Sequence, residues 1–309
     1  MINLVDESKW EQAFAGKYHS IYFDPKYLNI VKQSFGYEIS YYVFLKGNNL
    51  LFAAALFSKD AKIVVPYGFT YNSIFFDKNI GDRVYLEIFG DLVRTLKIKH
   101  KKMWLRLPPE ITDLRPFIWG GFHVMNRYTY FRKSTDGFSA KILKKVAQQR
   151  VGLTLEIADA NDEDVDLNLE TCFAHGLAKS MYPNYKTLFT QLSKKGYLKA
   201  FRIYKQGERQ VTRIALIDKE ASSLSTISMN VSNSTVLPFL NYEMYNWCAN
   251  NKIELVDMVG ANDKGVANFK YSFNAKLTPY YLVNYNRRRA IFLRLFGEIK
   301  NQLKNILGK

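Results

Sequence analysis

The sequence contains little cysteine and no long hydrophobic segment. Only Cys172 and Cys248 occur among the 309 residues, and each stands alone among residues typical of helices. We therefore expect reduced thiols in the core of a cytoplasmic protein. The longest apolar run, LLFAAALF at 50–57, is too short to span a bilayer, and the first residues lack the apolar segment of a signal peptide.

The motifs of several common enzyme classes are also missing. The sequence has no G-x-S-x-G elbow, no P-loop and no G-x-G-x-x-G, so hydrolase, kinase and dehydrogenase chemistry lose their usual support. No metal-ligand spacing connects the histidines, so no metal site is expected at His19, His100, His123 or His175.

One acidic segment resembles a calcium loop. Residues 159–170 read DANDEDVDLNLE, but Asp164 stands where an EF-hand requires glycine, and Asp166 stands where it requires an apolar residue. A helix capped by Asn161 or Asp162, with acids in its first turn, accounts for the same residues. We expect the capped helix.

Negative charge is scarce. The chain has 44 lysines and arginines against 28 acidic residues, a net charge of +16 with a pI near 9.6. Such an excess concerns partners and not the fold. It favours an anionic ligand, which we expect to be tRNA, a nucleotide-sugar or CoA pyrophosphate, or an acidic membrane surface.

The order of the expected elements occurs twice along the chain. In each half a helix is followed by a strand–turn–strand, a second helix and a further strand. These elements are expected at 24–36, 41–57, 84–96 and 102–107 in the first half, and at 182–196, 199–217, 236–248 and 253–259 in the second. The pattern predicts an α+β fold of two similar lobes, each a mixed, largely antiparallel sheet with packed helices. A helix within 134–152 would connect the lobes, with a ligand groove between them.

The segment at 260–281, GANDKGVANFKYSFNAKLTPYY, carries a lysine among aromatics. A polar loop follows a buried-type strand here, and such loops often carry the chemistry of α/β folds. When the first half of the sequence is shifted by 152 residues onto the second, Ile118 aligns with Lys270, so the lysine is specific to the second half. A solvated surface lysine and a lysine held in a cleft both remain open.

The C-terminal run at 287–309 is expected to form a basic amphipathic helix. Its apolar stripe favours packing onto the protein. Its lysines and arginines also suit an anionic membrane surface, and a peripheral contact through 287–307 at the inner face of the membrane stays open.

Two segments resemble the Fem family of bacterial peptidyltransferases, which are built from two acetyltransferase-like (GNAT) folds. They are PYGFTYNSIFFD at 66–77 and GVANFKYSFNAKLTPYY at 265–281, and the duplicated order of elements extends the resemblance over nearly the whole chain. Asn274 and Ala275 replace two glycines of the family motif. The long helical hairpin that some members carry for tRNA is absent.

The resemblance implies a fold and a site. It implies two tandem GNAT-like lobes at 1–140 and 141–284, followed by the tail at 285–309. The Phe-Lys pair of the family lies at its reaction centre, and the aromatic segment of the first lobe lines its precursor groove. The implied catalytic residues are thus Phe269 and Lys270, and the implied substrate-binding residues are Tyr67, Tyr71 and Asp77, to which we add Asn262 and Lys264 of the loop before the motif.

The resemblance also implies a reaction. Family members transfer an amino acid from aminoacyl-tRNA to an amine of a peptidoglycan precursor. We therefore expect an acyl- or aminoacyltransferase without a bound cofactor, acting on a cell-envelope precursor that is a small molecule or a lipid-linked glycan. No R/Q-x-x-G-x-G/A signature of a standard CoA site is found, so the donor stays open between aminoacyl-tRNA and acyl-CoA.

Two alternative functions remain from the sequence. One is an acyl-CoA-dependent N-acyltransferase acting on a sugar or small amine. The other is a non-catalytic protein that keeps the fold and binds RNA or a membrane surface, which explains the positive charge equally well. The sequence gives no basis for an oligomeric state.

Overall fold

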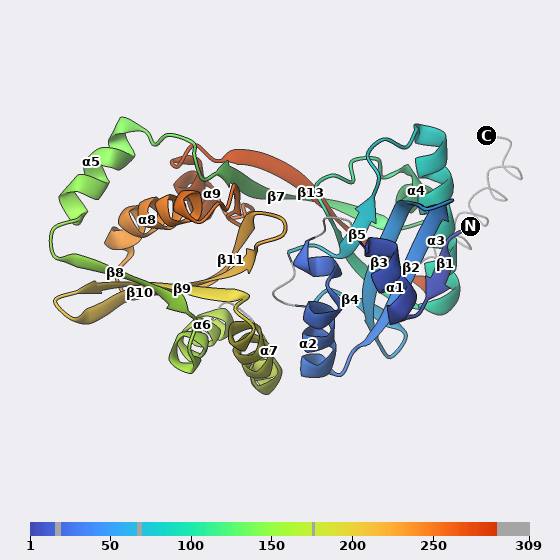
Figure 1. Cartoon of the computed structure of the whole chain (residues 1–309), viewed down its shortest axis with the longest axis horizontal. Coiled ribbons are helices and arrows are strands. Elements are labelled where there is room, and N and C mark those ends of the chain that lie inside the picture. The colour runs from blue at the N-terminus through green and yellow to red at the C-terminus, as the bar shows by residue number, and fades with distance from the viewer. Residues whose placement is uncertain (16–19, 67–69, 175–176, 289–309) are drawn as a thin grey trace, which may run out of the picture. The chain divides into compact units, whose positions relative to one another are not determined.

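The computed structural model describes residues 1–15, 20–66, 70–174 and 177–288. They form two compact units (Figure 1). Of the described residues, the first unit contains 1–15, 37–66, 70–126 and 280–288, and the second contains 20–36, 127–174 and 177–279. The sequence predicts that the first lobe ends at 140 and the second begins at 141, where the order of elements restarts along the chain. This boundary stays a prediction.

The first unit is a sheet with helices on both faces. Its strand order is β1-β2-β3-β4-β6-β13, with β5 also paired to β3, and every pairing is antiparallel except β4 with β6. Its elements are β1 (Asn3–Val5), α1 (Glu7–Phe14), β2 (Glu38–Lys46), β3 (Asn49–Lys59), β4 (Lys62–Val64), β5 (Ser73–Phe76), α3 (Asp82–Lys99), β6 (Lys102–Leu107), α4 (Arg115–Trp119) and the end of β13 (Lys276–Asn286).

Neighbouring tyrosines of β2 show how the two faces are used. The ring of Tyr41 lies 5.0 Å from that of Trp10 on α1. Tyr42 points to the opposite face, as successive residues of a strand do, and belongs to the core beneath α3. In that core the ring of Phe89 on α3 packs against Phe52 of β3 and Phe117 of α4. The aromatic content of the first half is therefore used mainly for packing.

Two glycines of the first unit differ in the space around them. A Cβ at Gly120 would overlap the side chain of Val93, whereas a Cβ at Gly90, inside α3, would meet nothing. Gly120→Ala should lower the free energy of unfolding by about 1–3 kcal/mol through overpacking. Gly90→Ala should raise it by about 0.5–1 kcal/mol, because alanine favours the helix. Urea unfolding of both variants checks this, and equal shifts would refute the packing described for Val93.

The second unit is a sheet in the order β7-β12-β11-β10-β9-β8, antiparallel except for β11 with β12. Its elements are η1 (Ile21–Phe23), α2 (Pro25–Phe35), β7 (His123–Lys133), α5 (Ala140–Gln149), β8 (Leu153–Asp159), α6 (Asp162–Ala174), η2 (Lys179–Met181), α7 (Tyr182–Lys194), β9 (Leu198–Lys205), β10 (Glu208–Asp218), β11 (Ser223–Val231), η3 (Ser234–Val236), α8 (Leu237–Asn250), β12 (Leu255–Asp257) and α9 (Lys264–Tyr271).

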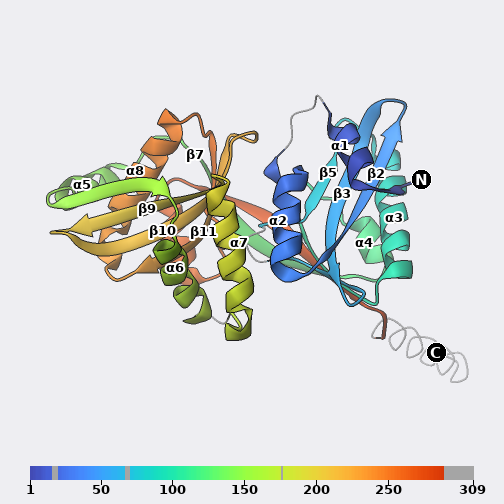
Figure 2. The ribbon, with the colours of Figure 1, turned by 60° about the horizontal axis from the view of Figure 1, so that its bottom comes forward.

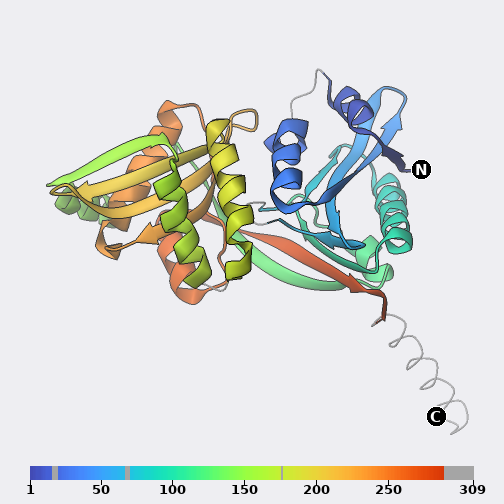
Figure 3. The same ribbon diagram turned by 90° about the horizontal axis from the view of Figure 1, so that it is seen from below.

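Helices cover both faces of this second sheet. Figure 1 shows α8 on one face and α6 with α7 on the other. Figure 2 shows β9, β10 and β11 side by side, and in Figure 3 α6 and α7 lie in front of these strands. On β9, Phe201 packs against Trp247 of α8, while the next residue, Arg202, bonds to Asp164 of α6. Successive side chains of β9 thus contact helices on opposite faces of the sheet.

The helix α6 begins at a reciprocal hydrogen-bonded cap. The amide N–H of Asp164 donates to Asn161 Oδ1, and the amide N–H of Asn161 donates to Asp164 Oδ2. This reciprocal cap confirms the predicted helix in place of a calcium loop.

The helix α2, from the start of the chain, packs on α7 within the second unit, with the ring of Phe35 4.9 Å from that of Tyr185.

The structure confirms the predicted α+β class with its mixed, mostly antiparallel sheet. The hairpins at 41–57 and 199–217 and the helices at 84–96 and 236–248 are present. The strand predicted at 253–259 is shorter, because Val259 and Gly260 adopt positive φ and end β12 at Asp257. No described helix is long and apolar enough to cross a membrane. The predicted tail at 287–309 lies outside the described residues except for its first two.

Candidate active site

The second unit contains a pocket of about 470 Å³ on the α8 face of its sheet. Its walls come from the middle of β10 and β11, the start of α8, the turn after β12, and α9. Most of the lining is apolar, with two hydroxyls and two cations. The lining residues are Arg213, Thr226, Ile227, Ser228, Met229, Leu237, Met258, Val259, Gly265, Val266, Phe269 and Lys270.

Lys270 lies in the last turn of α9 and points to the turn that follows β12. The helix begins at a cap in which Asp263 Oδ1 accepts from the amide N–H of Val266 at 3.0 Å. From the other end, Lys270 Nζ donates to the carbonyl oxygens of Met258 and Gly260, both at 2.6 Å, and to that of Val259. All three N–H groups of the ammonium are therefore directed at one short stretch of backbone.

That stretch of backbone is strained. Val259 has φ of 46° and Gly260 has φ of 63°. Positive φ is costly for a β-branched residue and persists only where surrounding contacts enforce it. Here Asp257 Oδ1 accepts from the amide N–H of Val259 at 2.8 Å, while Lys270 binds the carbonyl of the same residue. The turn is therefore fixed from two sides.

Two charges of opposite sign act on the Lys270 ammonium. Burial and, to a smaller extent, the positive charge of Arg213 lower the pKa of Lys270 to about 8, against the opposing effect of the Asp257 carboxylate. Asp257 is itself buried, and it also accepts from Thr129 Oγ1 at 2.5 Å. The ammonium therefore titrates closer to neutrality than an ordinary lysine.

Arg213 extends from β10 into the same pocket. Its side chain is almost fully buried, and it donates to Asn241 Oδ1 at 2.7 Å and to the sulfurs of Met229 at 3.1 Å and Met244 at 3.7 Å. Burial lowers the pKa of Arg213 to about 10. The pocket thus combines two cations with an apolar wall, and none of its described lining residues is acidic.

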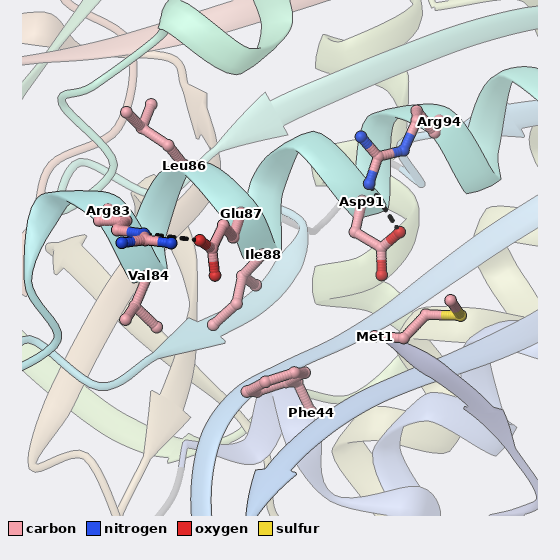
Figure 4. A pocket seen from close by; sticks show the side chains of 9 residues that line it. All are labelled: Met1, Phe44, Arg83, Val84, Leu86, Glu87, Ile88, Asp91 and Arg94. Carbon is pink, nitrogen blue, oxygen red and sulfur yellow. Dashed lines mark hydrogen bonds and ion pairs between the residues drawn. The ribbon is translucent and has the colours of Figure 1, made fainter.

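A hollow of about 770 Å³ in the first unit has a different charge pattern (Figure 4). It runs along α3, where Arg83 Nε lies 3.0 Å from Glu87 Oε1 and Arg94 lies 3.1 Å from Asp91. Asp91 also accepts from the amide N–H of Ile2 at 2.7 Å. Because the charged side chains of this larger hollow pair with one another, it offers no unpaired charged side chain to a ligand.

Another pocket of the first unit, of about 480 Å³, is basic. Lys62, Lys102 and Arg106 line it together with the exposed indole of Trp104, and no acidic side chain is among its described lining residues. Cations beside an exposed aromatic ring suit a phosphate-bearing ligand with a flat group.

The predicted site residues fall in different places. Phe269 and Lys270 line the pocket of the second unit. In the first unit the ring of Tyr71 packs against Tyr280, while Asp77 accepts from the amide N–H of Asn79 in a local turn. Asn262 and Lys264 are exposed and do not line the pocket; Asn262 accepts from the amide N–H of Tyr128. Tyr67 lies outside the described residues. The roles of all seven stay predictions.

Sequence reasoning missed Arg213. A signal was present, because the arginine interrupts an apolar strand in VTRIALI at 211–217. A cation at the centre of a strand that is otherwise buried requires a partner, and that requirement marks a candidate site. Among the described residues no group suited to holding a metal ion is present.

Comparisons with solved structures identify the fold. FemX matches with a TM-score of 0.61 at 11% identity, covering 91% of this chain and 96% of its own. A tandem GNAT protein from the clavulanic acid biosynthesis pathway matches with a TM-score of 0.55 at 10% identity, covering 93% and 99%. The fold is that of the tandem GNAT proteins. L-PGS from Bacillus licheniformis is similar as well, with a TM-score of 0.54 at 12% identity over 94% and 95% of the two chains.

The tandem GNAT fold agrees with the elements described above, since each unit has antiparallel strands followed by a parallel pair. No protein-family model matches the sequence, and no curated protein matches it either.

Proposed function

We propose that this protein is an acyl- or aminoacyltransferase that binds its acyl donor in the pocket of the second unit. The observation that carries the proposal is the half-buried ammonium of Lys270, fixed at the wall of a pocket of ligand size. The folds of FemX and L-PGS, and the Phe269–Lys270 pair that resembles the Fem motif, support the same function.

The reaction needs no covalent enzyme intermediate. The nitrogen of the acceptor amine attacks the carbonyl carbon of the donor, and a tetrahedral oxyanion forms. When the carbonyl is restored, the bond to the ribose oxygen of an aminoacyl-tRNA, or to the sulfur of a thioester, breaks. The proton lost by the amine passes to that leaving group. The absence of a nucleophile motif is consistent with this direct route, which depends on positioning.

Lys270 would stabilise the oxyanion in this reaction. Its charge is held in place before substrate arrives, so little reorganisation is needed. Because its three N–H groups bond to the carbonyls of Met258, Val259 and Gly260, direct donation to the oxyanion requires one carbonyl to be exchanged for substrate. Phe269 would pack against the acyl group.

The donor would be an aminoacyl-tRNA or an acyl-CoA, and the acceptor an amine of a cell-envelope glycan or peptidoglycan precursor. Both kinds of substrate carry phosphate, and the net charge of +16 with the basic pocket at Lys62, Lys102 and Arg106 supports binding of phosphate. An acyl-CoA-dependent transfer to a sugar or small amine uses the same machinery.

The basic pocket of the first unit also favours a second candidate, a non-catalytic RNA-binding protein. Binding would then weaken steeply with salt and would not depend on Lys270. Enzyme and binding protein are distinguished by incubating the protein with charged tRNAs or CoA thioesters and an envelope-type amine. A mass increase of the acceptor that requires Lys270 supports the transferase, whereas RNA binding without transfer supports the alternative.

The pH dependence of transfer provides a further prediction. The ammonium of Lys270 is the active form, and burial lowers its pKa from 10.5 to about 8. With an acceptor whose amine has a pKa below 8, the single-turnover rate should therefore rise as that amine is deprotonated and then fall as the pH rises through about 8. In Lys270→Arg the charge persists, so any remaining activity should lose this alkaline decline. A decline unchanged in that variant would assign it to another group.

A further inference from the structure

Three arginines of the second unit are almost fully buried, and they are satisfied in different ways. Arg132, Arg202 and Arg213 are 1%, 3% and 6% exposed. A buried guanidinium must replace its lost hydration with hydrogen bonds or opposite charge. The three arginines lie on strands of one sheet, so the hydrogen-bond partners of each can be compared with those of the other two.

Two of the three have complete structural roles. Arg202 donates to both carboxylate oxygens of Asp164, at 2.8 and 2.5 Å, and to Glu156 at 2.5 Å. Arg132 donates to four backbone carbonyl oxygens, at 2.5–3.2 Å, and stacks on Phe138 and Tyr245 with its guanidinium carbon 4.1 and 4.2 Å from the ring centres. Neither residue lines the pocket.

Arg213 has much weaker partners. Of its five N–H groups, the described structure gives one an oxygen acceptor, on Asn241, and otherwise offers the thioethers of Met229 and Met244. Thioether sulfur is a weak acceptor. No described carboxylate forms an ion pair with Arg213, yet its side chain lines a pocket with a second cation, Lys270. The site has more positive charge and more donors than the protein itself uses.

We propose that Arg213 binds an oxyanion of the substrate, so that the pocket selects an acyl donor carrying a carboxylate or phosphate on an apolar stem. A guanidinium binds either group with two parallel hydrogen bonds. The stem would lie against Met229, Leu237 and Val266. The claim that the pocket selects an acidic acyl donor rests on the proposed function, whereas the claim that Arg213 binds an anion does not.

Small ligands test anion binding without any transfer. Monomethyl glutarate carries one ester and one carboxylate, and dimethyl glutarate is its neutral match. By calorimetry the wild-type protein should bind the monoester at least about 10-fold more tightly, and Arg213→Met should remove that preference. Propyl phosphate forms a parallel arm: if it is preferred to monomethyl glutarate, phosphate is the anion. Equal binding of the charged and neutral esters by the wild type would overturn the proposal.

The stability of Arg213→Met separates a ligand-binding role from a structural one. Replacing an unpaired buried charge with an apolar side chain of similar size is neutral or stabilising. The melting temperature should therefore stay the same or rise. If Asn241, deprived of its partner, prevents folding, the pair Arg213→Met with Asn241→Leu removes the unsatisfied amide. Lys276→Met, at an exposed lysine, controls for the loss of one charge.

The transfer assay tests donor selection with isosteric donors. Glutamyl and glutaminyl groups on the same tRNA differ only in a carboxylate against an amide at the end of the acyl group, and succinyl-CoA differs from neutral butyryl-CoA chiefly in its carboxylate. We expect kcat/KM to favour the acidic donor by about 100-fold, and Arg213→Met to abolish that ratio while Lys276→Met keeps it. Transfer from neutral donors at equal rates would overturn the inference and leave the proposed function standing. No transfer from any donor would refute the proposed function, and the calorimetry would still decide anion binding.

Discussion

Lys270→Met should lower the rate of acyl transfer by about 10²–10³-fold, the loss typical of removing one oxyanion-stabilising donor. Methionine keeps most of the length of the side chain and removes the charge that faces the pocket. Lys270→Arg should retain part of the activity, because it retains the charge. Single-turnover kinetics with saturating donor and acceptor would measure the chemical step directly.

The same substitution should also affect stability. From the sequence alone, Lys270→Met is expected to leave thermal unfolding nearly unchanged. The structure changes this expectation. In Lys270→Met the carbonyls of Met258, Val259 and Gly260 lose their donor, and the strained turn loses one of the two side chains that hold it. We expect a loss of about 1–3 kcal/mol.

Controls can separate the charge from the turn. Lys276→Met removes an exposed lysine of the second unit and should leave both transfer and unfolding near wild type. Val259→Gly relieves the positive φ and keeps the ammonium, so transfer should persist if the charge is what matters. Full activity of Lys270→Met at a temperature where it is folded would exclude Lys270 from the reaction.

Arg202→Met should produce the largest loss of stability. It leaves the carboxylate of Asp164, which is 0% exposed, buried without its main partner. Breaking a buried ion pair in this way typically costs about 3–5 kcal/mol. Urea unfolding would measure the change, with Arg83→Met as the matched control: the pair of Arg83 with Glu87 is highly exposed, and its loss should change stability by less than about 1 kcal/mol.

A double substitution sharpens this prediction. Arg202→Met with Asp164→Leu removes both charges, so the unpaired carboxylate no longer contributes and part of the stability should return. The recovery is incomplete because Asp164 also caps α6 by accepting from the amide N–H of Asn161. If the single and double variants were equally unstable, the burial of an unpaired charge would not be the cause.

Local sequence patterns predicted much of the fold. The hairpins at 41–57 and 199–217 follow from alternation of side chains around glycine turns, and the helix beginning at Asp162 follows from its acidic first turn and cap. These features depend on residues close in the sequence. The packing of α2 on α7 joins residues about 150 positions apart, and no local pattern specifies such a contact.

The site was only partly predictable for a related reason. Lys270 could be singled out because it interrupts an aromatic stripe, but its partners are backbone carbonyls, which have no signature in the sequence. Tyr71 and Asp77 were inferred from the resemblance alone, and their described contacts are local packing and a turn. Arg213 was visible as a cation within an apolar strand, but its meaning depends on the pocket beside it.

The most direct test of the proposed function is mass spectrometry of an envelope-type amine acceptor after incubation with the protein and a panel of acidic and neutral aminoacyl-tRNAs and acyl-CoAs. We predict acylation of the acceptor from an acidic donor. The rate should fall about 10²–10³-fold in Lys270→Met, and the preference for the acidic donor should be lost in Arg213→Met. An acceptor that stays unmodified with every donor, or that Lys270→Met acylates as fast as the wild type, would contradict it.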